Sequence, residues 1–245
     1  MDHLTGRVAL VTGGARRLGA AIVRELHARG MRVVVHYRRS RSEADALLAE
    51  LERERAGDAA LVEADLSTPE APAELVRAAT ERFGRLDLLV NNASVFYPTP
   101  IGDLTRERWR ETLAANLEAP VFLIQAAASA LAASRGAVVN MTDAGLVRAP
   151  DRYAAYVAAK SGLAALTAAF ARELAPGVRV NAVAPGAILW PEPEPGEAEQ
   201  RSLLERIPLG RLGTPGEVAR AVAFLAAEPY LTGVTLPVDG GRALG

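Results

Sequence analysis

The order of short apolar runs and longer amphipathic segments limits most strongly what this chain can fold into. Seven runs have the length and composition of buried strands, at residues 7–12, 31–36, 59–64, 86–91, 136–141, 178–183 and 234–238. Helical segments lie between most of them, at about residues 18–29, 42–55, 69–83, 104–133, 153–174 and 215–227. Strands that alternate with helices form a parallel sheet covered by helices on both faces. The pattern therefore predicts a single doubly wound α/β domain over residues 1–245, with a parallel sheet of about seven strands.

Charge and composition exclude several classes of partner. Basic and acidic side chains nearly balance, 28 against 29, so the chain lacks the basic surface that nucleic-acid phosphates require. Cysteine is absent and the three histidines, His3, His27 and His36, lie far apart in the sequence, so we expect no disulfide and no metal site. The first residues do not read as a signal peptide, and the longest uncharged stretch, 119–134, is too short and polar for a bilayer. We expect a cytoplasmic protein with no membrane partner.

A glycine-rich turn, TGGARRLG at residues 12–19, lies between the first strand and the first helix. Glycines there let the backbone approach a pyrophosphate, whose charge the N-terminus of the following helix favours. Arg17 stands where a dinucleotide fingerprint has a glycine-type residue, and its guanidinium can reach a phosphate or an anionic face of a substrate. An ordinary strand-to-helix turn is the alternative, but the βαβ context favours nucleotide binding.

The end of the second strand indicates which dinucleotide binds. NAD-binding proteins of this architecture carry a carboxylate about twenty residues after the glycine turn, where it accepts hydrogen bonds from the ribose hydroxyls. This chain instead has His36, Tyr37, Arg38, Arg39 and Ser40. Cations and a hydroxyl suit a 2′-phosphate, so the segment predicts NADPH, bound by Arg39, Ser40 and His36. A solvated basic turn is the alternative.

The only lysine of the chain, Lys160, follows Tyr156 by four residues on a predicted helix. Residues four apart share a helix face, so we expect the ammonium and the phenol to lie side by side. A nearby ammonium favours the phenolate and lowers the pKa of the tyrosine from about 10, which makes it a proton donor and acceptor. A surface pair without function is the alternative, but the glycine-rich turn in the same chain favours a catalytic pair.

The motifs and their order resemble the short-chain dehydrogenase/reductase family over essentially the whole chain. The matching pieces are TGGARRLG at 12–19, Asp65, NNAS at 91–94, Asn116, YVAAK at 156–160, Pro185-Gly186 and VDGG at 238–241. The resemblance implies a Rossmann-type domain and hydride transfer between a nicotinamide and a carbonyl, alcohol or imine. It also implies a small-molecule substrate and a homotetramer.

The same resemblance implies roles for individual residues. Tyr156 would be the acid/base, Lys160 would bind the nicotinamide ribose and tune Tyr156, Asn116 would hold a proton-relay water, and Asp65 would contact the adenine. The cofactor contacts that it implies are Gly13, Arg16, Arg17, Leu18, Gly19, His36, Arg39, Ser40, Asp65, Leu66, Asn92, Ala93, Tyr156, Lys160, Pro185, Gly186 and Ile188.

One position departs from the family pattern. The family has a catalytic serine thirteen residues before the tyrosine, and this chain has Asp143. An ionised carboxylate only accepts hydrogen bonds and raises the pKa of a nearby tyrosine, so it cannot replace a hydroxyl. A protonated Asp143 can donate a proton, and an ionised one can accept hydrogen bonds from an amino-substituted ring such as a pterin. The alternative is that Thr142 supplies the hydroxyl.

Within the family, the chain resembles the pteridine reductases. The features that carry this likeness are RLG at 17–19, HYRRS at 36–40, NNASVFYPTP at 91–100 and the set of Asp143, Tyr156 and Lys160. The resemblance implies that Phe96 stacks on the pterin while Ser94 and Arg17 contact its polar edge. Phe96 as ordinary core packing is the alternative.

We therefore expect an NADPH-dependent reductase that transfers hydride to a pteridine of the dihydropterin or dihydrofolate type. One alternative is a 3-oxoacyl-[acyl-carrier-protein] reductase or another short-chain carbonyl reductase, and a second is a non-catalytic NADPH-binding sensor. The proline-rich, acidic stretch at 191–200 lies within a segment, 187–205, that we expect to be a mobile loop beside the substrate. Trp190 either covers the pocket or has a packing role.

Overall fold

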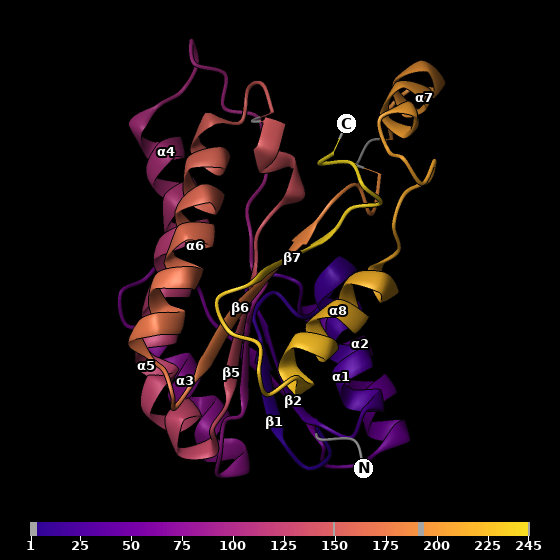
Figure 1. The fold of residues 1–245 in the computed structure, drawn as a ribbon. Coiled ribbons are helices and arrows are strands. Elements are labelled where there is room, and N and C mark those ends of the chain that lie inside the picture. Colours follow the sequence, from indigo (N-terminus) through magenta and orange to yellow (C-terminus); the bar gives the residue numbers. More distant parts are fainter. Residues whose placement is uncertain (1–3, 149, 191–193, 245) are drawn as a thin grey trace.

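Seven strands form one sheet in the order β3-β2-β1-β4-β5-β6-β7, and every neighbouring pair runs parallel (Figure 1). The computed structural model describes residues 4–148, 150–190 and 194–244. The predicted strands are all present, with ends that differ by two residues at most: β1 (Val8–Val11), β2 (Arg32–Tyr37), β3 (Ala59–Glu63), β4 (Leu88–Asn91), β5 (Ala137–Met141), β6 (Arg179–Pro185) and β7 (Thr235–Val238). The predicted single α/β domain with a parallel seven-stranded sheet is confirmed.

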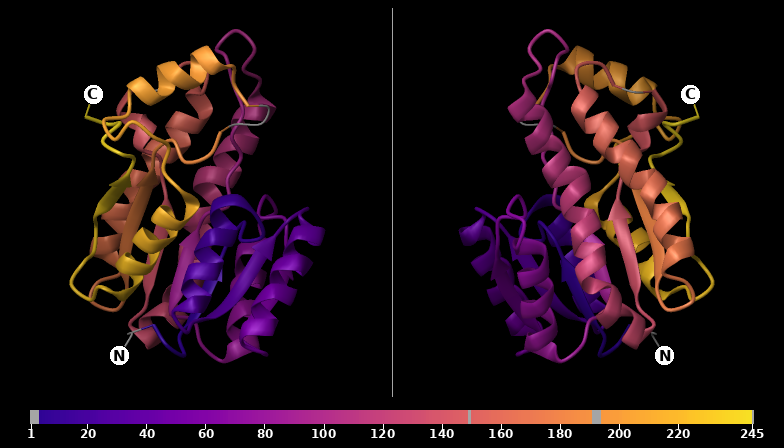
Figure 2. Two further views of the ribbon diagram at one scale, coloured as in Figure 1. Left: turned by 90° about the vertical axis from the view of Figure 1, so that its right-hand side faces the viewer. Right: turned by 90° about the vertical axis from the view of Figure 1, so that its left-hand side faces the viewer.

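Helices cover both faces of the sheet. The helices α1, α2 and α8 lie on one face, and α3, α5 and α6 lie on the other, as the two side views show (Figure 2). The helix bounds are α1 (Arg17–Ala28), α2 (Arg41–Glu54), α3 (Ala71–Phe83), α4 (Arg106–Leu113), α5 (Ala119–Ser134), α6 (Ala154–Glu173), α7 (Glu197–Glu205) and α8 (Pro215–Ala227).

The central strands β1, β4 and β5 are largely apolar because both of their faces are buried. Successive side chains of a strand point to opposite faces of the sheet. In β1, Ala9 and Val11 point into a buried cluster under α1 and α8, whereas Val8 and Leu10 point into a second cluster under α3 and α5. A strand between two helical layers therefore has no polar side of its own.

Two segments differ from the sequence-based expectation. The long helix predicted at 104–133 is α4 and α5 joined by a π-helical turn, Ala114–Glu118, which contains the buried Asn116. Within the predicted loop 187–205, residues Glu197–Glu205 form α7, and its first turn carries Glu197 and Glu199, where acidic side chains favour a helix start. Residues 191–193 of that segment lie outside the described residues, and its mobility stays a prediction.

Two helical stretches, Arg106–Ser134 and Ala154–Glu173, are long and apolar enough to cross a membrane by length and composition alone. Both belong to the helical layer on the sheet (Figure 1). On that face α5 contributes Leu123, Ile124 and Leu131 to the core. Their apolar character therefore has an explanation within the fold.

Candidate active site

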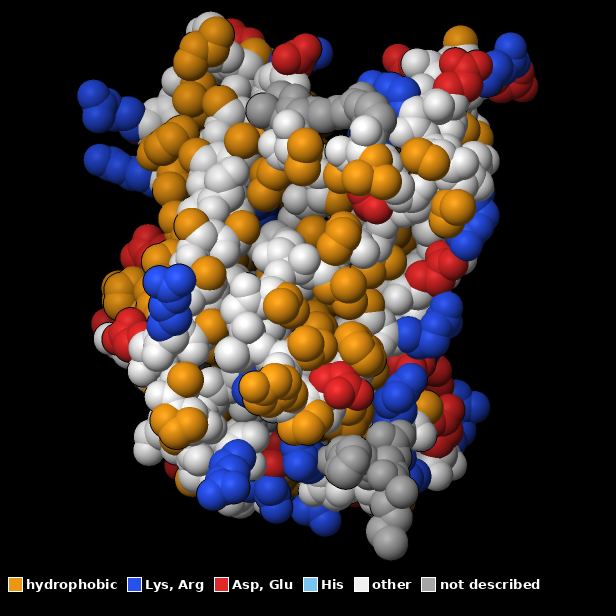
Figure 3. All heavy atoms as spheres, in the orientation of Figure 1, with side chains coloured by type: hydrophobic (Ala, Val, Ile, Leu, Met, Phe, Trp, Pro, Cys, Tyr) orange, Lys and Arg blue, Asp and Glu red, His pale blue; other side chains and the backbone are white. Residues whose placement is uncertain are grey.

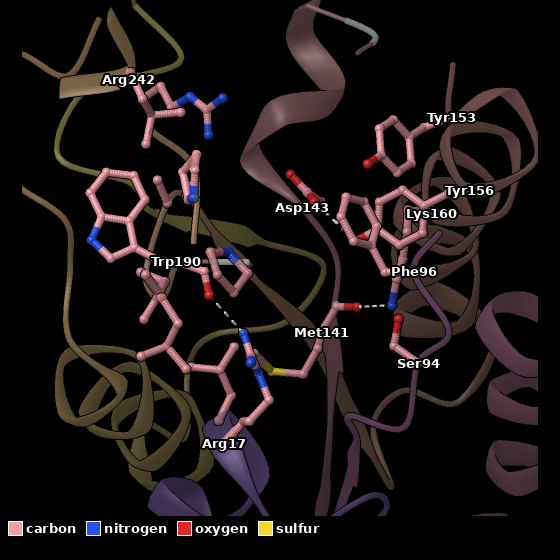
Figure 4. A pocket seen from close by; sticks show the side chains of 18 of the residues that line it. Arg17, Ser94, Phe96, Met141, Asp143, Tyr153, Tyr156, Lys160, Trp190 and Arg242 are labelled. Atoms are coloured by element: carbon pink, nitrogen blue, oxygen red, sulfur yellow. Dashed lines mark hydrogen bonds between the residues drawn. The ribbon is translucent and has the colours of Figure 1, made fainter. Parts of the chain in front are cut away.

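The carboxyl ends of the strands carry the candidate active site. β2 and β3 extend the sheet on one side of β1, and β4 to β7 extend it on the other, so the strand order reverses at β1. Ligands of doubly wound sheets bind at such a switch point. A pocket of about 860 Å³ opens there (Figure 4). The predicted site residues in its lining are Arg17, Leu18, Asn92, Ser94, Phe96, Asp143, Tyr156, Lys160, Pro185, Gly186 and Ile188.

The glycine positions of the glycine-rich turn leave no room for a side chain. Gly13 has a φ of 59°, and a Cβ on it would lie 3.0 Å from the Cα of Ala93. A Cβ on Gly19 would collide with the carbonyl oxygen of Gly13. Arg16 is the N-cap of α1 and makes no side-chain capping hydrogen bond. Its side chain therefore leaves the first N–H groups of the helix available to a ligand. A pyrophosphate binds where the backbone can approach it closely and where the N–H groups of a helix N-terminus point at it.

Asn92, which follows β4, fastens this turn. Its side-chain amide donates to the carbonyl oxygens of Thr12, at 2.8 Å, and Gly13, at 3.0 Å. The Thr12 hydroxyl in return accepts from the backbone N–H groups of Asn92 and Ala93, both at 2.9 Å. The predicted cofactor residues Gly13, Asn92 and Ala93 therefore lie together at the ends of β1 and β4.

The predicted phosphate ligands at the end of β2 differ in their surroundings. His36 is buried; its Nδ1 accepts from the N–H of Gly13 at 3.1 Å, so its Nε2 carries the proton and donates to the carbonyl oxygen of Ala64 at 3.1 Å. Burial lowers the pKa of His36, so the ring is neutral near pH 7. Arg39 is exposed, and Ser40, the N-cap of α2, makes no side-chain capping bond. His36 uses both of its ring nitrogens within the protein, and the contact of Arg39 and Ser40 with a phosphate stays a prediction.

Asp65, the predicted adenine contact, and Leu66, a further predicted cofactor contact, follow β3. The carboxylate of Asp65 accepts from the hydroxyl of Ser67 at 2.7 Å and from its N–H at 3.1 Å. These bonds, aided by Arg38 at 3.6 Å, lower the pKa of Asp65. Leu66 packs against the core on one face of the sheet. The adenine contact itself stays a prediction.

Asp143, Tyr156 and Lys160 come together where β5 ends and α6 begins (Figure 4). The Tyr156 hydroxyl donates to one carboxylate oxygen of Asp143 at 2.9 Å, and the other oxygen accepts from the N–H of Gly145 at 2.6 Å. The Lys160 ammonium is buried, donates to the carbonyl oxygen of Met141 at 2.8 Å, and lies 5.9 Å from the centroid of the Tyr156 ring. The phenol is thus bonded to the carboxylate rather than to the ammonium.

This arrangement corrects one expectation about the phenol. Burial, together with the charge and the hydrogen bond of Asp143, raises the pKa of Tyr156 well above its ordinary value. The prediction that Lys160 lowers it is wrong, because the carboxylate is the charge that contacts the hydroxyl. The effect expected of a carboxylate at position 143 is confirmed. Burial also lowers the pKa of Lys160 to about 8, with the charge of Asp143 opposing that shift.

Thr142 does not offer a replacement hydroxyl. Its side chain is buried, and its hydroxyl donates to the carbonyl oxygen of Val183 at 3.1 Å. The bond ties β5 to β6 at the floor of the pocket. The alternative in which Thr142 replaces the family serine therefore has no support from its position.

Asn116 holds the loop after β4. Its side-chain amide donates to the carbonyl oxygens of Val95 and Thr112, both at 3.0 Å, and its carbonyl oxygen accepts from the hydroxyl of Ser94 at 2.6 Å. The π-helical turn brings this side chain inward, where it is buried. Asn116 thus positions Ser94, and its predicted part in a proton relay stays a prediction.

The ring of Phe96 lines the pocket and is 57% exposed, which excludes ordinary core packing. It stacks on Tyr153 with ring centroids 4.5 Å apart and planes 7° from parallel, and it meets Tyr156 edge-on at 4.8 Å. On the facing wall lies Trp190, whose carbonyl oxygen accepts from Arg17 at 3.5 Å (Figure 4). Trp190 also lines the pocket, which resolves the alternative between a pocket and a packing role.

The lining residues that the sequence analysis missed include Met141, Tyr153, Arg206 and Arg242. Tyr153 lies three residues before Tyr156 at the start of α6, a spacing that puts both on one side of a helix. Arg206 and Arg242 follow α7 and β7, and no local pattern marks them. Across the described residues, no group of three histidine or acidic side chains is placed to hold a metal ion.

The fold and this site define a dinucleotide-dependent oxidoreductase, and comparisons with known proteins agree. A family model described as enoyl-(acyl carrier protein) reductase matches residues 13–243. A 3-oxoacyl-[acyl-carrier-protein] reductase of Synechocystis sp. is 41% identical, with all of both chains covered. A 3beta-hydroxysteroid dehydrogenase 1 of Eggerthella lenta is 37% identical over 99% of this chain and 96% of the relative. Pteridine reductase 1 of Leishmania tarentolae is 36% identical over 98% and 97%.

These matches show the family. The chain belongs to the short-chain dehydrogenase/reductase family, whose members are oxidoreductases that use NAD(P)(H). The predicted family and enzyme class are therefore confirmed.

Proposed function

We propose that this protein is an NADPH-dependent reductase that transfers hydride to a pteridine. The observation that carries the proposal is the carboxylate of Asp143, bonded to Tyr156 in a pocket that also presents the exposed ring of Phe96. A carboxylate accepts hydrogen bonds from the amino and N–H groups of an aminopteridine, whereas it has nothing to donate to a ketone oxygen. The exposed aromatic ring suits stacking on a flat heterocycle.

The residues of the glycine-rich turn fit a dinucleotide, because a Cβ would fill the space at Gly13 and Gly19. NADPH supplies a hydride when bound. The turn would hold its pyrophosphate, Arg39 and Ser40 its 2′-phosphate, and Lys160 its nicotinamide ribose. The preference for NADPH over NADH rests on the arginine and hydroxyl after β2, where an NAD-binding site would carry a carboxylate.

Reduction of a C=N bond adds one hydride at carbon and one proton at nitrogen. The raised pKa of Tyr156 keeps the phenol protonated at neutral pH, so a proton is present in the site. The 2.9 Å hydrogen bond to Asp143 joins the two oxygens through which this proton can pass to the ring nitrogen. A solvent proton then restores the pair.

A 3-oxoacyl-[acyl-carrier-protein] reductase is the second candidate, and the comparisons favour it over the pteridine reductase. The Synechocystis relative shares 41% identity with this chain, against 36% for the Leishmania pteridine reductase, and the family model has an acyl-carrier-protein description. The site geometry gives this candidate less support, because position 143 carries a hydrogen-bond acceptor where the family serine would add a second donor beside Tyr156 for a ketone oxygen. Another short-chain carbonyl reductase, such as a hydroxysteroid dehydrogenase, meets the same objection.

A non-catalytic NADPH-binding sensor is the third possibility. A sensor needs the dinucleotide pocket, but it does not need side chains that transfer a proton, such as the Tyr156 phenol hydrogen-bonded to the Asp143 carboxylate near the Lys160 ammonium. The bonds that join Asp143, Tyr156 and Lys160 to β5 and α6 therefore favour an enzyme.

NADPH oxidation measured side by side with dihydrobiopterin, dihydrofolate and an acetoacetyl thioester tests the proposal. We expect turnover of at least one dihydropteridine and little turnover of the thioester. Asp143→Ser should shift this balance toward the thioester, because it restores a hydroxyl donor. Activity of the unchanged protein on the thioester alone would refute the pteridine and support the second candidate.

We also propose a cytoplasmic homotetramer. Apolar side chains gather over β7 and α8 in the middle of the face shown in Figure 3, while charged side chains lie mostly toward its margin. Phe224 of α8 is 47% exposed and Val234, just before β7, is 36% exposed. On the opposite helical layer, Phe122 of α5 is 44% exposed. These apolar surfaces support association of subunits.

A further inference from the structure

The pocket has two unlike walls. One wall carries Phe96, Tyr153, Tyr156 and Asp143, and the facing wall carries Trp190 and Arg242 (Figure 4). In the close view the guanidinium of Arg242 points into the pocket from the turn after β7. The proposed reaction uses the first wall, and no step of it uses Arg242.

The turn that carries Arg242 is held firmly. The carboxylate of Asp239 accepts from the N–H groups of Gly241, at 2.9 Å, and Ala243, at 2.8 Å. Gly240 has a φ of 64°, and a Cβ on it would lie 2.8 Å from the side chain of Ile207. The backbone on both sides of Arg242 is therefore fixed by hydrogen bonds and by close packing, so the arginine leaves the chain from a defined point.

The guanidinium of Arg242 lacks a protein partner within the described ranges, where it makes neither an ion pair nor a side-chain hydrogen bond. Its residue is partly buried. The nearby Arg211, by contrast, is bonded to both carboxylate oxygens of Glu217, at 2.7 and 3.1 Å. A partly buried guanidinium presents a planar fork of donors that matches the two oxygens of a carboxylate or phosphate.

The charges around Arg242 reinforce this preference. Arg206 and Arg17 also line the pocket, and Glu199 is the acidic residue of α7 that lines it with them. Asp143 is the other acidic lining residue, and its oxygens accept from Tyr156 and Gly145. Among the described residues, the pocket lining carries four basic side chains, including Lys160, against two acidic ones, and this excess of positive charge attracts an anion.

We propose that Arg242, assisted by Arg206, binds an anionic group at the end of the substrate remote from the reacting ring. The inference rests on the proposed function, since it places the ring against Phe96 and Asp143. The shared chemistry is a carboxylate or phosphate. The carboxylate would come from the glutamate tail of a folate-type pteridine. If the second candidate function holds, the phosphate would come from the pantetheine arm of an acyl thioester.

Steady-state kinetics with two dihydropteridines tests the first source. Dihydrofolate has two tail carboxylates, and dihydrobiopterin has an uncharged side chain. With Arg242→Gln we expect the KM for dihydrofolate to rise about tenfold or more with kcat nearly unchanged, because a charge-assisted hydrogen bond is lost. The KM for dihydrobiopterin should stay within about twofold. Arg242→Lys, which keeps the charge, should recover part of the loss.

Arg201→Gln is the matched control, because Arg201 lies on α7 but does not line the pocket. It should leave both KM values unchanged. Equal effects of Arg242→Gln on the two dihydropteridines, or no effect on dihydrofolate, would overturn the carboxylate site. Thermal unfolding of each variant separates a folding defect from a binding defect.

A second pair of substrates separates failure of the inference from failure of the proposed function. If neither dihydropteridine is reduced, the same variants are assayed with acetoacetyl-CoA and with a neutral acetoacetyl-N-acetylcysteamine thioester. A KM rise confined to the CoA ester supports the anion site with a phosphate, while equal responses overturn it. Calorimetric titration of the NADP⁺-loaded protein with folic acid and with pterin gives the same comparison without turnover, and equal affinity losses there would also overturn the site.

Discussion

The single lysine provides a sharp test of the electrostatics of the site. Lys160 is buried, and burial lowers its pKa from 10.5 to about 8. Below pH 8 the folded protein keeps a buried ammonium, which opposes folding. Between pH 8 and about 10.5 the unfolded chain still binds this proton and the folded protein does not, so the free energy of unfolding rises with pH.

The size of the effect follows from the two pKa values. Their difference, 10.5 minus about 8, corresponds to roughly 3 kcal/mol of destabilisation at pH 7, of which about 2 kcal/mol disappears between pH 8 and pH 10. Lys160→Met removes the ammonium and keeps a similar volume. We expect the free energy of unfolding of the unchanged protein, minus that of the variant, to rise by about 2 kcal/mol over this interval. Urea unfolding followed by circular dichroism, at one protein concentration, measures the difference.

Tyr156→Phe is the matched control. The raised pKa of Tyr156 contributes stability that is present below about pH 10 and lost above it, so the phenol has little effect between pH 8 and 10. The free energy of unfolding of Tyr156→Phe should still rise between pH 8 and pH 10, whereas Lys160→Met should lack this rise. If the curves of the unchanged protein and Lys160→Met run parallel over this interval, Lys160 does not carry a depressed pKa and the reasoning is refuted.

Three further predictions concern catalysis and cofactor binding. Tyr156→Phe should lower kcat by about 10²- to 10⁴-fold while NADPH affinity, measured by fluorescence titration, is unchanged; full turnover would instead favour Asp143 as the acid. Arg39→Asp should weaken NADPH binding at least tenfold and NADH binding far less, and an unchanged preference would exclude Arg39 as a phosphate ligand. Gly19→Ala should reduce NADPH affinity more than tenfold, because its Cβ collides with the carbonyl oxygen of Gly13. Gly102→Ala, at a position with open space, should leave that affinity unchanged.

The central strands were predictable because helices bury both of their faces. Val8 to Val11 contact cores on alternating sides, so every residue is apolar and the run is visible without a structure. The π-helical turn at Ala114–Glu118 was not predictable, since one extra residue per turn hardly changes an apolar helix pattern. The helix α7 was missed because it begins within the proline-rich, acidic stretch at 191–200 and has no buried residue, so it shows no apolar helical pattern.

The site was predictable where motifs place residues at fixed spacings and less so where tertiary contacts decide their chemistry. Helical spacing placed Lys160 beside Tyr156, but it does not reveal that the phenol donates to Asp143 or that the ammonium donates to Met141. His36 was expected among the phosphate ligands from its place in the sequence. Its bonds to Gly13 and Ala64 arise from two other strand ends, which local sequence does not describe.

The carboxylate at position 143 has a consequence for the lysine as well as for the phenol. Burial opposes the charge of Lys160, and Asp143 is the group that favours it, so the carboxylate helps to keep the ammonium charged at neutral pH. A hydroxyl in its place would remove this support and also lower the pKa of Tyr156. Asp143 thus shifts the pKa of both neighbours, in addition to the larger effect of burial. An aspartate in place of the family serine therefore changes the pKa values of the proton-transferring groups in the site. For this reason we expect the substrate to be determined by Asp143 rather than to follow overall sequence identity.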